Sequence, residues 1–218
     1  MSRAASAGEE TYAPTRRDFV AGAGAVLGLC AVGGIGVATA GDELLRPPGG
    51  QSESAFIARC TRCDRCRSIC PTGVIDLATV EDSFLSARTP IMNYHRGDCD
   101  YCGKCQSVCP TGALGSFEPE NDKIGVAVVR SDRCVAYSSG GCTKCYEVCP
   151  YEAITLNDSN HPLVDAEVCN GCGVCEYACP SLVFLAFQGG TRRGIKVETQ
   201  STYEAYGSVT TVSEGGED

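Results

Sequence analysis

Short apolar stretches alternate with turn-rich polar stretches along the chain, which is the pattern of small β-hairpins. The clearest case is Ile154 to Leu156, followed by the turn "NDSNHP" and by Leu163 to Asp165. Two further pairs of strands are predicted in the same way. They are "VIDLA" with "PIMNY" (74–78 and 90–94) and "GALGSF" with "KIGVAVVR" (112–117 and 123–130). Towards the end, "SLVFLAF" (181–187) is predicted to be a closing strand, and "IKVET" (195–199) one more.

The longest apolar stretch lies near the N-terminus and carries no charge from Phe19 to Ala40. It follows "TRRDF" at 15–19 and ends in "ATAGD", where Ala38 and Ala40 form an A-x-A cleavage site. An Arg-Arg pair with Phe and an apolar run resembles a twin-arginine export signal. The alternative is a membrane anchor, since the run is long enough to span a bilayer. Cys30 is interpreted as a small apolar residue of this segment.

Composition shows that an ordinary hydrophobic core does not hold this chain together. Its 218 residues include 17 cysteines, no Trp and only 6 Phe, and such chains depend on disulfides or metal sites. The formal charge is −9, and no basic run resembles a nucleic-acid footprint. Nucleic acid is therefore not expected as a partner.

Sixteen of the cysteines fall into four runs. Three runs have the spacing C-x2-C-x2-C-x3-C-P, which is the bacterial [4Fe–4S] ferredoxin run. They are Cys60, Cys63, Cys66 and Cys70; Cys99, Cys102, Cys105 and Cys109; and Cys169, Cys172, Cys175 and Cys179. In such a run three thiolates bind one cluster and the fourth binds a partner cluster, so runs come in pairs.

The remaining run is "CVAYSSGGCTKCYEVCP", in which seven residues separate Cys134 from Cys142, the first of a tight group with Cys145 and Cys149. Counting ligands makes Cys134 necessary, because without it one cluster would have three thiolates. The residues "SSGG" at 138–141 give the longer loop the freedom to bring Cys134 back. We therefore predict four [4Fe–4S] clusters with the sixteen cysteines as the iron ligands. An open iron with Cys134 idle is the alternative.

The runs and hairpins together predict an α+β, ferredoxin-like fold with two pairs of [4Fe–4S] modules. We divide the chain into a signal peptide or anchor (1–40), a linker (41–52), the four-run region (53–190) and a C-terminal strand with a disordered acidic tail (191–218). Phe184 and Phe187 are expected to pack on a cluster rather than form a docking patch. His95 and His161 are interpreted as ordinary surface or loop residues, because every cluster already has four thiolates.

Neither zinc knuckles nor a disulfide scaffold explains one spacing repeated with Pro after each last cysteine. No dinucleotide fingerprint, P-loop or nucleophile motif is present. Because no run lacks a ligand, the expected function is one-electron transfer without a substrate site of its own. An export route for folded proteins also suits thiols that are committed to metal before crossing the membrane.

The run order, the twin-arginine leader, "LRPPG" at 45–49 and the third run with "YEVCP" and "AITL" resemble the NapG/MauM-type periplasmic ferredoxins. The resemblance implies electron transfer from a quinol-oxidising membrane ferredoxin-type partner to a periplasmic reductase, often a molybdenum enzyme. Runs two and four have the plain spacing, so the resemblance does not extend to nitrate as acceptor.

Two alternatives remain open from the residues. The chain could be a tightly bound iron–sulfur subunit of a molybdopterin oxidoreductase, or, from another class, a zinc- or disulfide-stabilised interaction module. The pairing of the runs is open as well: adjacent (one with two, three with four) or nested (one with four, two with three).

Overall fold

The computed structural model describes Gly28, residues 43–184 and residues 192–210. The chain divides into two compact units, Met1–Gly41 and Asp42–Asp218, and all described residues except Gly28 belong to the second. Apart from Gly28, the predicted signal or anchor with Cys30 lies outside the described part, as do Phe187 and the last eight residues. No helix in the described residues has the length and apolar character needed to cross a membrane.

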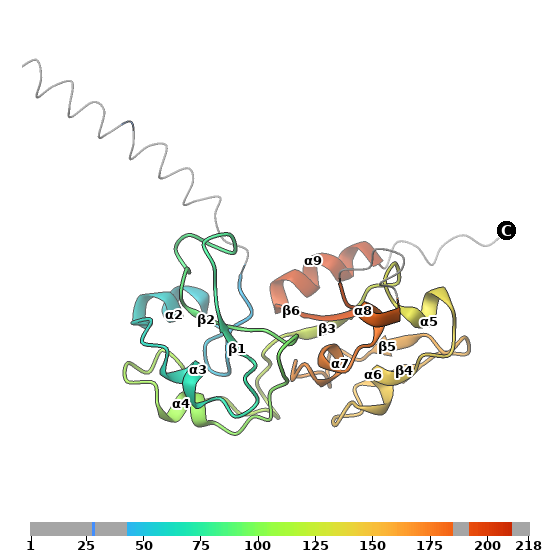
Figure 1. Ribbon diagram of the computed structural model, residues 1–218, viewed down its shortest axis with the longest axis horizontal. Coiled ribbons are helices and arrows are strands. Elements are labelled where there is room, and N and C mark those ends of the chain that lie inside the picture. The colour runs from blue at the N-terminus through green and yellow to red at the C-terminus, as the bar shows by residue number, and fades with distance from the viewer. Residues whose placement is uncertain (1–27, 29–42, 185–191, 211–218) are drawn as a thin grey trace, which may run out of the picture. The chain divides into compact units, whose positions relative to one another are not determined.

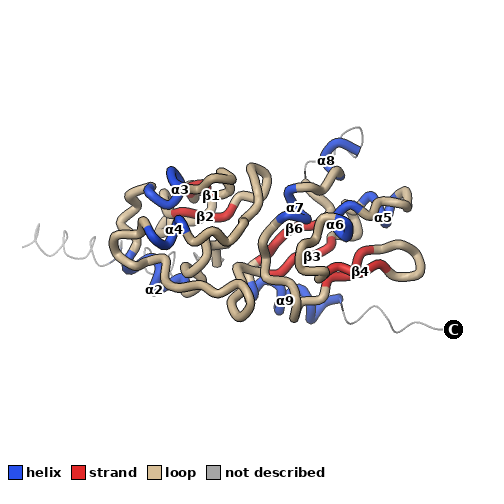
Figure 2. The backbone as a smooth tube through the Cα atoms, turned by 90° about the horizontal axis from the view of Figure 1, so that it is seen from below, coloured by secondary structure: helices blue, strands red, loops and turns tan. Residues whose placement is uncertain are grey.

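Short helices and short strands make up the second unit (Figures 1 and 2). The helices are α2 (Glu53–Arg59), α3 (Arg65–Ile69), α4 (Lys104–Ser107), α5 (Val135–Ser138), α6 (Lys144–Glu147), α7 (Val174–Tyr177), α8 (Ser181–Phe184) and α9 (Gln200–Thr210). The strands are β1 (Ile75–Leu77), β2 (Pro90–Met92), β3 (Val126–Val129), β4 (Ile154–Leu156), β5 (Pro162–Val164) and β6 (Ile195–Glu198). The third cysteine of each run lies in α3, α4, α6 or α7.

Three antiparallel strand pairs accompany the cysteine runs. The predicted hairpins β1–β2 and β4–β5 are confirmed, with Asp76 opposite Ile91 and Thr155 opposite Leu163. The predicted pairing of 112–117 with 123–130 is wrong, because β3 pairs with β6, with Ala127 opposite Val197. Segment 112–117 packs on the side of α2 instead, where Ala113 and Leu114 are buried against Phe56.

The core joins strand residues to cysteines. Val126, Ile154 and Ile195 are each no more than 2% exposed and pack in one apolar cluster with Cys169 and Cys175. The strands therefore cover the cysteine loops rather than enclosing a large apolar core of their own, as the composition indicated. Hydrophobic residues and cysteines bury one another in this arrangement.

The predicted closing strand at 181–187 is a helix over its described part, α8. The N–H groups of Val183 and Phe184 both bond the carbonyl of Pro180, which continues the turn that follows Cys179. Phe184 is 64% exposed, so its predicted packing on a cluster is wrong. The strand predicted at 195–199 is confirmed as β6.

The predicted linker and the start of the predicted tail both have defined contacts in the second unit. The acidic tail begins with α9, and Thr199 accepts a bond from the Thr202 N–H at 3.3 Å in the manner of a helix N-cap. The predicted linker packs into the unit over 43–52, where Arg46 is 1% exposed. The Ser201 hydroxyl also donates to Glu43 at 2.6 Å, which ties the two segments together.

Arg46 explains the "LRPPG" stretch in structural terms. Its guanidinium makes two bonds to the Glu53 carboxylate, at 2.6 and 2.5 Å, and donates to the Thr89 hydroxyl and the Pro90 carbonyl at 2.7 and 2.9 Å. It also lies 4.7 Å from the centre of the Phe56 ring. One buried cation thus joins the N-terminal segment to α2 and to β2.

Replacing Glu53 by alanine is expected to lower the free energy of unfolding by about 3 kcal/mol, because it leaves the buried Arg46 charge without its carboxylate. Glu147→Ala removes an exposed carboxylate, 3.5 Å from Lys144, and should change the same quantity by about 0–1 kcal/mol. Chemical denaturation of both variants measures the two changes in the free energy of unfolding. If the two substitutions lower it equally, the Arg46–Glu53 ion pair contributes no more to stability than an exposed pair.

Candidate iron–sulfur sites

The cysteine side chains gather around separate cavities, and each cavity receives three cysteines from one run and the last cysteine of another. The described residues form three such cavities. The first-run cavity is lined by Cys60, Cys63, Cys66 and Cys109; the second-run cavity by Cys99, Cys102, Cys105 and Cys70; and the fourth-run cavity by Cys169, Cys172, Cys175 and Cys149.

The remaining four cysteines form the third-run group: Cys134, Cys142, Cys145 and Cys179. Burial raises the pKa of Cys145 to about 12, and the negative charge of Cys134, Cys179 and Cys142 contributes to the rise. The pKa of Cys134 is raised by burial and by the charges of Cys179 and Cys142. Charge interactions thus link the four sulfurs of the third-run group. The three cavities bring the other twelve predicted site cysteines together in groups of four.

Cys134 reaches its group through a loop unlike those of the other runs. In runs one, two and four a residue in the left-handed conformation precedes the helix that holds the third cysteine: Asp64, Gly103 and Gly173. In run three this residue is Thr143, with an ordinary φ of −115°, and Gly140 and Gly141 have φ of +71° and +77° instead. The left-handed turn has moved upstream, which allows the longer spacing.

The buried thiols favour a cofactor that carries positive charge. Burial is the main cause that raises the pKa of Cys66 and Cys99 to about 12 and that of Cys105 and Cys172 to about 11. Four such groups around one cavity lose their protons when a metal centre binds and compensates their charge. The sixteen cysteines form no disulfide with one another. No group of His, Cys, Asp or Glu among the described residues is placed to hold a single metal ion.

Hydrogen bonds to sulfur also suit iron–sulfur ligation, because such bonds stabilise the thiolate and tune a cluster's potential. Burial raises the pKa of Cys70 and Cys109, but bonds from a threonine hydroxyl two residues later and from backbone N–H groups outweigh it, so both pKa values are lowered. Ser181 lies in the equivalent position beside Cys179, with Oγ 3.2 Å from the sulfur. Tyr151 occupies that position after Cys149.

The second-run and fourth-run cavities meet at the loop 169–173. The N–H of Cys99 donates to the carbonyl of Cys172 at 2.9 Å. The hydroxyl groups of Tyr94 and Tyr101 donate to the carbonyls of Gly171 and Asn170, at 2.5 and 2.9 Å. Residues that line two different cavities are thus in direct contact.

Several residues beside the cavities were not found from the sequence. The sequence patterns assign no role to these two tyrosines or to Glu176. Glu176 is 3% exposed, and burial is the main cause that raises its pKa to about 7. His95 Nε2 lies 3.8 Å from its carboxylate, while His161 stacks on the Tyr137 ring with centroids 3.9 Å apart. These side chains are identified only by their contacts with residues that are far away in the sequence.

Comparisons with known proteins agree with this organisation. A family model described as a 4Fe-4S dicluster domain matches residues 59–113 and 133–183. The chain is 38% identical to the ferredoxin-type protein NapG of Escherichia coli (strain K12) over 186 residues, covering 75% of this chain and 78% of NapG. It is 34% identical to the methylamine utilization ferredoxin-type protein MauM of Paracoccus denitrificans (strain Pd 1222) over 187 residues, covering 76% and 83%. Identity to the ferredoxin-type protein NapF of Escherichia coli (strain K12) is 30% over 141 residues, covering 62% and 80%.

Proposed function

The chain belongs to the NapG/MauM family of ferredoxin-type proteins, and on this basis we propose that it relays electrons through four [4Fe–4S] clusters held in two adjacent pairs. Runs one and two would form one pair, and runs three and four the other. The two dicluster matches support this pairing, since each spans two neighbouring runs. The exchange of last cysteines between neighbouring runs supports it as well, because Cys109 lines the first-run cavity and Cys70 the second-run cavity.

The observation that carries the relay is the contact between the two inner cavities. The bond from the Cys99 N–H to the Cys172 carbonyl joins a residue of the second-run cavity to one of the fourth-run cavity. With the adjacent pairing, the four sites follow one another in the order first, second, fourth, third. Such a row is what a multi-step electron relay requires, because transfer between centres slows steeply with distance.

Each cluster, when bound, supplies one-electron chemistry. The chain's own residues hold it and control its surroundings: the thiolates bind iron, and strand residues such as Ile154 and Val197 line the fourth-run cavity and keep water from it. Backbone N–H groups bond the sulfurs, as Ala127 does to Cys169 at 3.4 Å. These contacts would set the potentials of the separate sites.

We further propose that the protein is exported by the twin-arginine machinery and works in the periplasm or on the outer face of the membrane. The "TRRDF" motif, the apolar run and the A-x-A site support this proposal. There it would receive electrons from a quinol-oxidising, ferredoxin-type membrane protein and deliver them to a molybdenum-type reductase. It would have no substrate site of its own.

The test is metal analysis of the mature protein purified without oxygen. About sixteen irons and as many sulfides per chain are expected from four [4Fe–4S] clusters, with electron paramagnetic resonance signals that appear on reduction. Zinc, or no metal, would favour a zinc- or disulfide-stabilised interaction module and contradict the proposal. Constant one-to-one recovery with a large catalytic subunit would instead identify a subunit of a molybdopterin oxidoreductase.

A further inference from the structure

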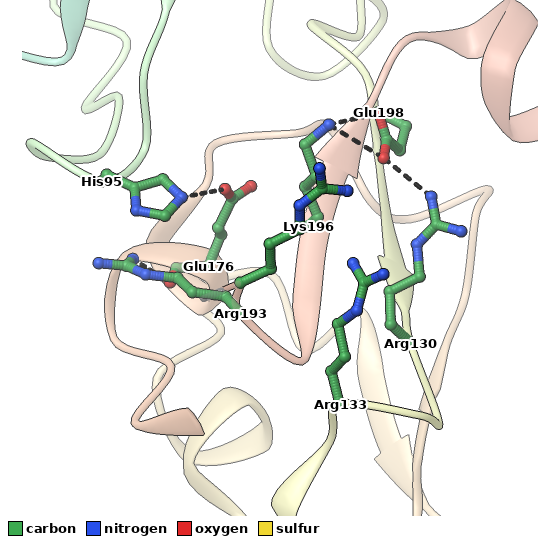
Figure 3. A pocket seen from close by; sticks show the side chains of 8 residues that line it. His95, Arg130, Arg133, Glu176, Arg193, Lys196 and Glu198 are labelled. Carbon is green, nitrogen blue, oxygen red and sulfur yellow. Dashed lines mark hydrogen bonds and ion pairs between the residues drawn. The ribbon is translucent and has the colours of Figure 1, made fainter. Parts of the chain in front are cut away.

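A cationic hollow lies on the surface beside β3 and β6. We use this name for the cavity of about 440 Å³ that Figure 3 shows from close by. It is lined by His95, Arg130, Arg133, Glu176, Arg192, Arg193, Lys196 and Glu198. Figure 3 shows the carboxylates of Glu176 and Glu198 on opposite sides, with the Lys196 side chain between them and Arg133 below. The dipeptide Arg192–Arg193, which belongs to none of the sequence motifs, also lies here.

The hollow has the opposite charge to the chain as a whole. Five arginine and lysine side chains line it against two carboxylates, which leaves three positive charges in excess on a protein with a formal charge of −9. Glu198 is paired with Arg130 and Lys196 at 3.0 Å each, and Arg133 with Asp132 at 3.0 Å. Burial, together with the charges of Arg193 and Lys196, lowers the pKa of His95, which indicates a positive local field.

This hollow adjoins the third-run group, the last site in the proposed row. Arg133 directly precedes Cys134 in the chain. Gly194, between two of the lining residues, packs so closely on the same cysteine that an added Cβ would lie 2.7 Å from the Cα of Cys134. The Gly194 N–H donates to the Ser181 hydroxyl at 2.7 Å, and that hydroxyl lies beside the sulfur of Cys179.

We propose that the cationic hollow is the docking surface for a redox partner protein with an acidic face, and that electrons enter or leave the chain here through the third-run site. The inference rests on the proposed electron transfer. Opposite charge on two surfaces speeds their encounter and orients them without tight binding, which suits a carrier that must release its partner. The net negative charge elsewhere would turn an acidic partner away from other faces.

A partner surface fits the hollow better than a small anion does. The side chains of Lys196 and Arg133 are 56% and 40% exposed, so they can adapt to a broad face. An exposed aromatic side chain continues the surface on the neighbouring helix α7. Tyr177 is 47% exposed, and its ring centre lies 5.9 Å from the Arg193 guanidinium. A charged centre with an apolar border offers both orientation and contact area to a docking protein.

The first test measures binding of a fluorescein-labelled hexaglutamate peptide to the cluster-loaded protein by fluorescence anisotropy. We expect binding that weakens with added salt and falls by about tenfold in the double variant Arg192→Glu/Lys196→Glu. Arg88→Glu, a charge reversal in the loop before β2, is the control and should bind as the wild type does. Unchanged binding by the double variant would overturn the proposal. Displacement by inorganic phosphate at constant ionic strength would also overturn it, in favour of a small-anion site.

The second test compares oxidation of the reduced protein by anionic ferric-EDTA and by cationic hexaammineruthenium(III) in stopped flow. In each case one electron leaves the protein, iron(III) or ruthenium(III) becomes the divalent ion, and no bond forms or breaks. If electrons leave through the hollow, added salt should lower the rate of oxidation by ferric-EDTA, although the protein has a net charge of −9. The double variant should be oxidised by ferric-EDTA about tenfold more slowly than the wild type. The inference is contradicted if added salt raises the rate at which ferric-EDTA oxidises the protein.

These tests separate failure of the inference from failure of the proposed function. If the protein lacks iron or cannot be reduced, the proposed electron relay is refuted, whether or not the hexaglutamate peptide binds. If the double variant and the Arg88→Glu control both carry their clusters and exchange electrons as fast as the wild type, the electron relay stands and the docking surface is refuted.

Discussion

Alanine in place of Gly173 is expected to lower the thermal stability of the protein by roughly 10 °C, which corresponds to about 3–5 kcal/mol. Gly173 has a φ of +82°, where a side chain is strained. Its added Cβ would lie 2.0 to 2.4 Å from three carbons of the Tyr94 ring, and that ring is 2% exposed. Because Tyr94 also bonds the Gly171 carbonyl, the ring cannot move without disturbing the loop of the fourth-run cavity.

Gly103 supplies a matched control, because it holds the equivalent position before the third cysteine of run two. Its φ is +68°, but the nearest atom to an added Cβ is Gln106 Oε1 at 3.5 Å. Gly103→Ala should therefore show the backbone strain alone, about 1 kcal/mol or roughly 3 °C. The thermal loss of visible cluster absorbance measures both variants at one heating rate. Similar losses would mean that contact with Tyr94 does not matter.

Alanine in place of Cys109 is expected to remove about four irons per chain, the content of one [4Fe–4S] cluster. Adjacent pairing makes this cluster the one that Cys60, Cys63 and Cys66 share with it. Adding Cys63→Ala should then remove no further iron, because both substitutions affect the same cluster. Adding Cys145→Ala should raise the loss to about eight irons, because Cys145 belongs to the third-run group.

Nested pairing reverses both outcomes, so the two double variants decide between the arrangements. If run two pairs with run three, Cys109 and Cys145 share a cluster, and that double variant loses only about four irons. The variant with both Cys109→Ala and Cys63→Ala would then lose about eight irons. Iron and sulfide per chain, together with the intensity of the resonance signal of the reduced protein, give the measurement.

The strand predictions succeeded where the paired strands are close in sequence and failed where they are not. The hairpins at β1–β2 and β4–β5 were found because each pair is close in sequence and separated by turn residues. The pairing of β3 with β6 was missed, since the partners are separated by two cysteine runs. Residues 181–184 were apolar enough for a strand, but their backbone N–H groups bond to the carbonyl of Pro180 as a helical turn.

The sequence by itself determined the chemistry of this protein: the iron–sulfur runs and their sixteen cysteines. Such features are local, because three thiolates around one cluster require a set spacing on one loop. The tertiary structure decided which last cysteine lines which cavity, how Cys99 meets Cys172, and that cations from residues 130 to 196 share one hollow. These contacts join residues far apart in sequence, and they depend on how buried surfaces pack, which no local spacing encodes.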